Sequence, residues 1–172
     1  MRSVDRPGVE GISIRARSVG PIVTAGILLG CGLGGFFDGI VFHQILQWHN
    51  MLSSVRPPTD LLTMKYNMLW DGLFHAATWL MTSAGVGRLW VAAKRNEGLW
   101  STSAFVGALL LGWGLFNALE GLIDHQLLGI HHVHPGRHQV AWDLGFLASG
   151  VLMIAVGSWL VRRARSARPL LR

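Results

Sequence analysis

Asp38-Gly39-Ile40-Val41-Phe42-His43-Gln44-Ile45-Leu46-Gln47-Trp48-His49 is the first of two copies of one pattern in this 172-residue chain. The second copy begins 82 positions later, and it is Glu120-Gly121-Leu122-Ile123-Asp124-His125-Gln126-Leu127-Leu128-Gly129-Ile130-His131. Both copies read [DE]-G-x-x-x-H-Q-x-L-x-x-H, and each ends a long apolar stretch. An ionisable group inside hydrocarbon costs about 2.5–3.5 kcal/mol, so such groups usually face other helices and indicate a functional site.

The composition predicts an integral membrane protein. Hydrophobic residues make up 51% of the chain and charged residues only 14%, whereas soluble chains carry about 25% charged residues. About 20 apolar residues are needed to span a bilayer as a helix. Four stretches meet that length, and the fold class that they predict is an all-α integral membrane protein, an antiparallel four-helix transmembrane bundle. They are Pro21–Trp48, Met64–Val91, Trp100–Ile130 and Ala141–Val161.

A second similarity extends the repeat to all four spans. Trp70-Asp71 in the second span corresponds to Trp142-Asp143 in the fourth. The chain therefore reads as two repeated helix hairpins, about 21–91 and 100–161, inside one transmembrane domain of residues 21–161. An N-terminal tail (1–20) and a basic tail (162–172) flank it. The two hairpins share one orientation, which predicts a pseudo-two-fold axis along the membrane normal.

Local signals predict where helices end and how closely they pack. Pro57-Pro58 is expected to end the first helix, and Asp60 or Thr59 to cap the second. The first span carries Gly26, Gly30 and other glycines at small-xxx-small spacing, which lets helices approach closely in a membrane.

The charge distribution predicts the orientation. Twelve of the fifteen basic residues fall on one side, and the other three are Arg56, Lys65 and Arg137. The positive-inside rule places both termini in the cytoplasm, with the motif histidines toward the outer leaflet. The lipid bilayer, and not a nucleic acid, is then the partner of the basic segments.

Acidic and histidine side chains from all four spans are expected to meet near that outer leaflet. Mixed carboxylate and imidazole ligands suit iron, zinc, manganese or copper(II). The sequence therefore predicts a mono- or dinuclear transition-metal site, with iron, copper or zinc as the cofactor. The candidate metal ligands are Asp38, His43, His49, Asp71, His75, Glu120, Asp124, His125 and His131.

The helical phase supports only part of this set. Asp38 and His49 differ by about 20° around an ideal helix, but Asp38 and His43 differ by about 140°. Either a local bulge at Gly39 and Gly121 brings His43 and His125 into line, or these histidines point sideways toward a neighbouring helix. Bulges of the π type occur at functional sites.

Three other interpretations stay open. The acids and histidines could form interhelical hydrogen bonds without a metal. A haem could be held by His43 and His125 as axial ligands. A copper carrier would use soft thioethers and the histidine loop as a relay, with these residues: Met51, Met64, Met68, His132, His134 and His138.

The motifs resemble a family of small bacterial membrane proteins of unknown function. The resemblance rests on Gly35-Phe36-Phe37-Asp38-Gly39-Ile40, on His43-Gln44-Ile45-Leu46-Gln47-Trp48-His49 and on the stretch from Gly112 to His125. It covers about residues 26–161 and implies a four-span fold in a bacterial inner membrane, with no catalytic residues to transfer. An association of such proteins with haem–copper oxidase assembly would favour copper.

The function predicted from the sequence is that of a membrane metalloprotein that carries out redox chemistry. The alternatives are copper handling or assembly for a respiratory-chain oxidase, and haem binding. Whether the chain is an enzyme stays open, as does a homo-oligomeric state. An enzyme would be a metal-dependent membrane oxidoreductase, which needs an open coordination position.

Overall fold

The computed structural model describes residues 18–97 and 100–166, so most of the two tails lies outside the described residues. The described chain forms four long helices and no strands. In order, the elements are α1 (Gly20–Phe37), η1 (Asp38–Ile45), α2 (Leu61–Lys94), α3 (Thr102–Glu120), η2 (Gly121–Leu127) and α4 (Gln139–Ser166). The elements η1 and η2 are π-helical continuations of α1 and α3.

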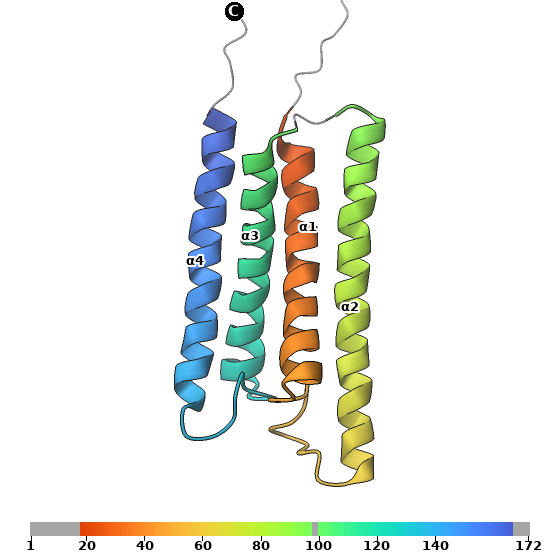
Figure 1. The fold of residues 1–172 in the computed structure, drawn as a ribbon, viewed down its shortest axis with the longest axis vertical. Coiled ribbons are helices and arrows are strands. Elements are labelled where there is room, and N and C mark those ends of the chain that lie inside the picture. Colours follow the sequence, from red (N-terminus) through yellow and green to blue (C-terminus); the bar gives the residue numbers. More distant parts are fainter. Residues whose placement is uncertain (1–17, 98–99, 167–172) are drawn as a thin grey trace, which may run out of the picture.

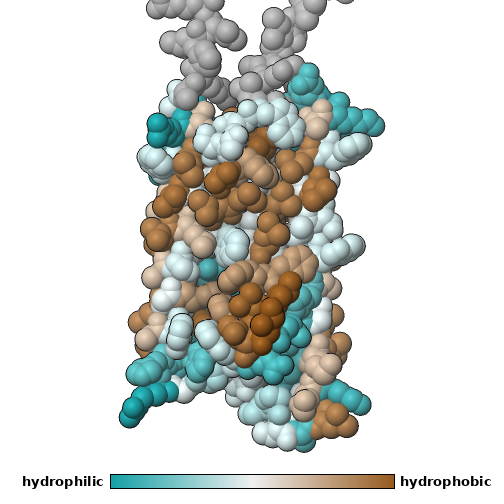
Figure 2. Space-filling model, in the orientation of Figure 1, coloured by the Kyte–Doolittle hydropathy of each residue, from teal (hydrophilic) through white to brown (hydrophobic). Residues whose placement is uncertain are grey.

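Three helices are long and apolar enough to cross a membrane: Gly20–Ile45, Thr102–Leu127 and Gln139–Ser166. The helix α2 is longer still, at 34 residues, but it is not among these three, and it carries Lys65, Asp71 and His75. The surface is also consistent with a membrane protein, because one face shows a mostly apolar middle between polar ends (Figure 2).

The helices pack in the order α2, α1, α3, α4 (Figure 1). The helices α1 and α3 contact each other in the middle, α2 packs against α1, and α4 packs against α3. The outer faces of α2 and α4 are exposed and apolar, as at Trp79 and Trp159. The beginning of α1 and the end of α4 lie at one end of the molecule, and both motif copies lie toward the other (Figure 1).

Glycines allow the close approach of α1 and α3. A Cβ atom added at Gly30 would collide with the carbonyl oxygen of Leu109, and one at Gly112 with that of Ile27. The same holds between α3 and α4, where a Cβ on Gly114 would lie 2.6 Å from the carbonyl oxygen of Gly150. Small residues let helix backbones touch where the hydrophobic effect no longer drives association.

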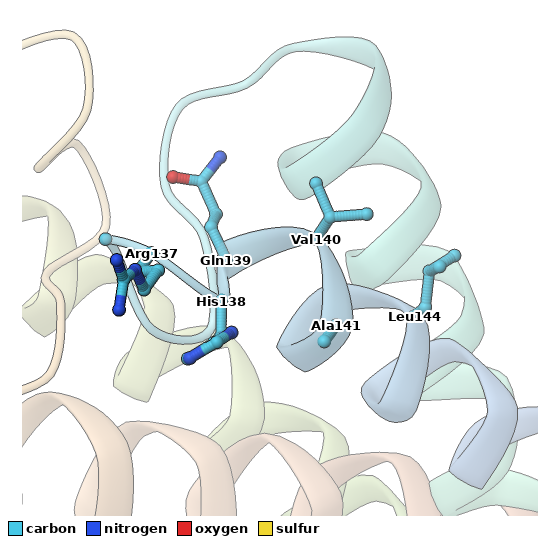
Figure 3. A pocket seen from close by; sticks show the side chains of 7 residues that line it. Arg137, His138, Gln139, Val140, Ala141 and Leu144 are labelled. Carbon is cyan, nitrogen blue, oxygen red and sulfur yellow. The ribbon is translucent and has the colours of Figure 1, made fainter.

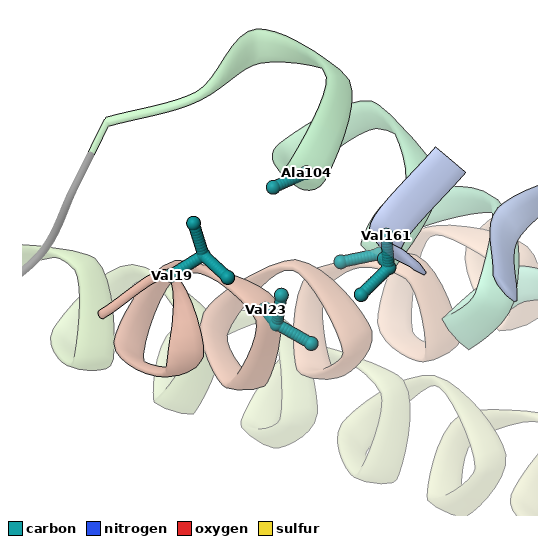
Figure 4. Close-up of a cluster of buried hydrophobic side chains, with 5 residues drawn as sticks. Val19, Val23, Ala104 and Val161 are labelled. Carbon is teal, nitrogen blue, oxygen red and sulfur yellow. The ribbon is translucent and has the colours of Figure 1, made fainter. Parts of the chain in front are cut away.

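The buried apolar cluster lies at the end of the molecule away from the motifs. Val19, just before α1, and Val23 on α1 meet Ala104 and Ala108 on α3 and Val161 on α4 (Figure 4). Toward the other end, the largest buried side chains are instead polar, among them His43, His131, Asn67 and Asp38. The apolar core therefore supports one end of the molecule, and polar contacts fill the other.

One predicted helix boundary is wrong, and one predicted helix cap is confirmed. The first helix ends at Ile45, twelve residues before Pro57, so Pro57-Pro58 does not end it. Asp60 is the cap of α2, as one of the two predicted alternatives had it, because its carboxylate accepts the backbone N–H groups of Leu62 and Thr63 at 2.8 and 3.0 Å. The hydroxyl of Thr63 completes the capping box by accepting the Asp60 N–H.

Candidate metal centre

Most of each motif copy is wound as a π-helix, η1 in the first copy and η2 in the second. The N–H group of a π-helical residue bonds to the carbonyl five residues earlier, so side chains five apart lie closer to one face than they do in an α-helix. In η1 this places Nε2 of His43 3.1 Å from Oδ2 of Asp38, without hydrogen-bond geometry. In η2 it brings a ring nitrogen of His125 to within 4.8 Å of a carboxylate oxygen of Glu120. Of the two alternatives for the helical phase, the structure has the bulge.

The chain then turns back at the same point of each copy. Gln47 has a φ of 51° and Gly129 a φ of 58°, both in the left-handed region. The backbone N–H of Trp48 bonds to the Phe42 carbonyl at 2.9 Å, and that of Ile130 bonds to the Asp124 carbonyl at 3.0 Å. These turns fold His49 and His131 back over the ends of η1 and η2.

Six buried groups therefore meet in one cluster. Their side chains form three overlapping sets of three whose ligand atoms lie within 4.8 Å of one another. The ring centroids of His43 and His49 are 4.4 Å apart, and those of His49 and His131 are 4.8 Å apart. The metal cluster, as we call it from here on, consists of Asp38, His43, His49, Glu120, His125 and His131, none more than 5% exposed.

The atoms that face one another in the metal cluster have no hydrogen-bond partner. These atoms are the Nε2 atoms of all four histidines and both carboxylate oxygens of Asp38 and of Glu120. A buried polar atom without a partner costs about 1–3 kcal/mol, and native proteins contain few of them. Such a concentration in one place fits a site whose ligand satisfies them together.

The opposite nitrogen of two histidines is held by the other half of the molecule. Nδ1 of His49 donates a hydrogen bond to the Val133 carbonyl at 2.8 Å. Nδ1 of His131 donates one to the Met51 carbonyl at 3.1 Å. A carbonyl acceptor fixes the proton on Nδ1, which leaves the lone pair of Nε2 free for a metal.

The other two histidines are held by acids of the Trp-Asp helices. Nδ1 of His43 lies 3.0 Å from Oδ1 of Asp71, in a hydrogen bond. Nδ1 of His125 lies 3.5 Å from Oδ1 of Asp143, which is longer. Carboxylates in this position orient a ligating imidazole and raise its basicity.

Both supporting acids are themselves held in the same way. Asp71 accepts the backbone N–H of Met51 at 2.8 Å and the amide of Asn50 at 2.8 Å. Asp143 accepts the backbone N–H of Val133 at 3.0 Å and Nδ1 of His132 at 2.7 Å. Each loop that leaves a π-helix thus fixes the acid that orients that π-helix's histidine.

His49 and His131 lie beyond the ends of the helices, and both are neutral at physiological pH. Burial, with the neighbouring imidazole of His43, lowers the pKa of His49 to about 4. Burial and the neighbouring imidazoles of His49, His125 and His43 lower the pKa of His131 to about 2. Desolvation favours the uncharged form of an imidazole, and the neutral form is the one that binds metals.

The structure brings six of the nine predicted ligands together. Of the other three, Asp71 contacts the metal cluster through His43. His75 donates from Nδ1 to the Asp71 carbonyl of its own helix at 2.7 Å and lies outside the three sets. Asp124 also lies outside these sets.

Sequence reasoning assigned no ligand-orienting role to Asp143, Asn50 or His132. The signal was present, since the 82-residue offset that pairs His43 with His125 also pairs Asn50 with His132. The Trp-Asp similarity pairs Asp71 with Asp143. These two pairings indicate which acids, and which of their hydrogen-bond donors, occupy equivalent positions in the two halves.

The remaining loop histidines lie apart from the metal cluster. The ring of His134 packs edge-on against Trp48, with centroids 5.0 Å apart. His138 lies beside Arg137 in a separate pocket at the start of α4, and no member of the metal cluster lines that pocket (Figure 3). His138 is therefore a useful control residue.

Comparison with known proteins adds the family. Residues 25–164 match the family described as "Predicted membrane protein (DUF2243)". The chain belongs to this family. The predicted resemblance to a membrane-protein family of unknown function is thereby confirmed. Neither a curated protein nor a solved structure matches the chain.

Proposed function

We propose that this chain is an integral membrane metalloprotein with a mono- or dinuclear redox centre in the metal cluster. One observation carries the proposal. Four imidazole Nε2 atoms and two carboxylates are buried together without hydrogen-bond partners, while the Nδ1 atom of each imidazole faces a carbonyl or a carboxylate. Interhelical hydrogen bonds would instead satisfy the Nε2 atoms.

The ligand set narrows the choice of metal. Four nitrogen and two carboxylate ligands suit iron, copper(II) or zinc, and thiolate ligands are not involved because Cys31 lies outside the metal cluster. The three sets of three share members, among them His43 and His131, which fits one ion or two adjacent ions. Two ions would leave coordination positions open for a substrate.

Haem is the weaker alternative. Axial ligation would need the space between two imidazoles for the plane of a macrocycle. The rings of His43 and His131 have centroids 5.8 Å apart, but the carboxylates of Asp38 and Glu120 and two further imidazoles surround them. Those groups occupy the positions that the macrocycle would need.

Metal analysis tests this proposal. Protein purified in mild detergent without a histidine tag should carry one or two transition-metal ions per chain. A redox-active centre should change its optical or paramagnetic spectrum on reduction. Bound zinc alone would restrict the site to non-redox chemistry, a Soret band would identify haem, and protein that neither retains nor rebinds metal would contradict the proposal.

For the membrane, we propose four spans, formed as two repeated hairpins, with both termini in the cytoplasm. The basic residues Arg88, Lys94 and Arg162 lie toward the end of the molecule away from the metal cluster, as the positive-inside rule requires. The metal cluster would then face the periplasmic side of an inner membrane. Reporters fused at Lys94 and at the C-terminus should report cytoplasm, and one at Pro135 the outside; an outward C-terminus would overturn this orientation.

Copper handling for a respiratory oxidase is the second candidate, and one pocket favours it. A pocket of about 400 Å³ reaches His43 and Asp71, and the thioether side chains of Met64 and Met68 line it. Thioethers select copper(I), and residues four apart share one face of α2. A soft donor pair beside a ligand histidine is what a copper relay needs.

The relay can be separated from the redox centre. Replacing Met64 and Met68 with leucine should lower copper loading in cells while the purified protein still binds added metal. Met153→Leu, outside this pocket, is the control. If cellular loading is unchanged in the double variant, the relay is wrong and the buried centre acts without it.

A further inference from the structure

A second pocket reaches the metal cluster from the apolar part of the molecule. It has a volume of about 250 Å³ and lies between α1, α2, α3 and η2. Its walls are mostly apolar, and its polar end carries two carboxyl groups. The lining residues are Cys31, Met81, Phe116, Leu119, Glu120, Ile123 and Asp124. Since Glu120 also belongs to the metal cluster, this pocket adjoins the proposed centre.

The mouth of the pocket faces outward at the depth of the proposed spans. Leu119 is 56% exposed, Ile123 41% and Met81 39%, so these walls lie on the outer surface of the helices. Cys31 precedes Asp38 by seven residues of helix, which places it roughly 10 Å further from the loop end. In the proposed membrane orientation, the pocket opens to lipid and not to the aqueous side.

Asp124 has no counterpart in the first half and no partner among the described residues. The 82-residue offset pairs it with Phe42, so the repeated pattern does not need an acid there. Its side chain is half-buried, and no hydrogen bond or ion pair of the described chain involves it. An ionisable group at membrane depth usually has a partner or marks a substrate path, so a ligand with hydrogen-bond donors would satisfy it.

We propose that this pocket binds the ring of a membrane-dissolved quinol, whose hydroxyl groups donate to the carboxylates of Asp124 and Glu120. The proposal rests on the proposed redox centre and names its substrate class. The volume suits one substituted six-membered ring, and the apolar walls with Phe116 suit its faces. A fatty acid would bring a third carboxylate, and a lipid acyl chain offers no donor.

Cys31 makes the pocket measurable, because it is the only cysteine of the chain and lines this pocket. The full chain in lipid nanodiscs is alkylated with N-ethylmaleimide, with and without duroquinol, a tetramethyl quinol kept reduced without oxygen. At ten times its dissociation constant, the quinol should slow alkylation roughly tenfold. Durene, the same ring without hydroxyl groups, should protect far less.

The variants test the contact with Asp124. Asp124→Phe, which introduces the residue of the first half, should abolish protection by duroquinol, and Asp124→Asn should weaken it. Gln126→Asn, on the exposed face of η2 and outside the pocket, is the matched control and should keep full protection. If Cys31 is not alkylated at all, the same comparisons are made by equilibrium binding of radiolabelled duroquinol.

Two outcomes overturn the proposal. Equal protection by durene and duroquinol would show an apolar pocket for lipid only, and unchanged protection in Asp124→Phe would place the ring elsewhere. Metal content is measured in parallel to separate the two proposals. Quinol binding by a wild-type chain that neither retains nor rebinds metal would support the pocket and contradict the centre, whereas a metal-loaded chain that does not bind quinol would contradict the pocket alone.

Discussion

The two halves of the molecule agree at the metal cluster and differ around it. Asp38, His43 and His49 have the counterparts Glu120, His125 and His131, with the same winding and the same turn. The side chains that line the approaches are not paired in this way. Met64 and Met68, beside His43, correspond to Gly136 and Val140, and Asp124 corresponds to Phe42. The residues that both halves share are therefore those of the proposed centre, and the residues that differ line the two pockets beside it.

The largest expected effect is the loss of metal from either half. His43→Ala and His125→Ala each remove one Nε2 ligand from the metal cluster and should each abolish stoichiometric metal, measured by elemental analysis of the purified protein. His138→Ala, in the loop pocket, should keep it. If one of the two ligand variants keeps its full metal content, the halves are not equivalent and the site belongs to one of them.

The next effect concerns the acids that orient those histidines. Asp71→Asn and Asp143→Asn should each lower metal affinity by about 10- to 100-fold, as loss of an orienting carboxylate usually does. The contact of His43 with Asp71 is 3.0 Å and that of His125 with Asp143 is 3.5 Å, so Asp71→Asn should cost more. Competition with a chelator of known affinity measures both, and an equal or reversed order would contradict the distances.

Much of this arrangement could be predicted from the sequence. The apolar stretches predicted helices whose ends lie within a few residues of those in the structure, and the repeated pattern predicted all six members of the metal cluster. The periodicity of an ideal helix could not decide the direction of His43 or His125, because a π-helix depends on packing that no local pattern encodes. Residues five apart meet only after that winding changes.

The sequence also could not distinguish the six members of the metal cluster from the acids and histidines close to them. Asp71, His75 and Asp124 carry the same side-chain chemistry as the metal cluster and lie in the same part of the chain. Only distances show that Asp71 bonds to His43 and that His75 bonds to its own helix. The packing order of the helices, with α2 and α4 on the outside, likewise depends on which glycines meet which backbone.

A smaller effect should appear as a pH dependence of the metal-free protein. Burial lowers the pKa of His49 to about 4 and that of His131 to about 2, while an unfolded histidine has a pKa of about 6.5. Below that value the unfolded chain binds protons that the folded chain does not. The contribution of His49 and His131 to the free energy of unfolding should therefore be highest above about pH 6.5 and fall as the pH decreases, by up to about 1.4 kcal/mol per pH unit and residue.

Denaturant titrations in detergent, from about pH 4 to about pH 8, measure this slope. His49→Asn and His131→Asn should each reduce it by a similar amount, since the two rings occupy equivalent positions. His138→Asn should leave it unchanged. A slope that one variant removes and the other does not would show that the two halves differ inside the metal cluster as well as around it.

The smallest expected effect comes from making the first half more like the second at His75. A Cβ on Gly39 would lie 2.7 Å from the His75 ring, and one on Gly121 would lie 2.9 Å from the Leu147 side chain. The two residues thus fill the same place in the two halves, and one of them cannot bind a metal. His75→Leu should keep full metal content and, as a swap of similar volume, cost less than about 1.5 kcal/mol of stability. If His75→Leu loses metal as His43→Ala does, His75 is a seventh ligand, and the equivalence of the two halves no longer identifies the centre.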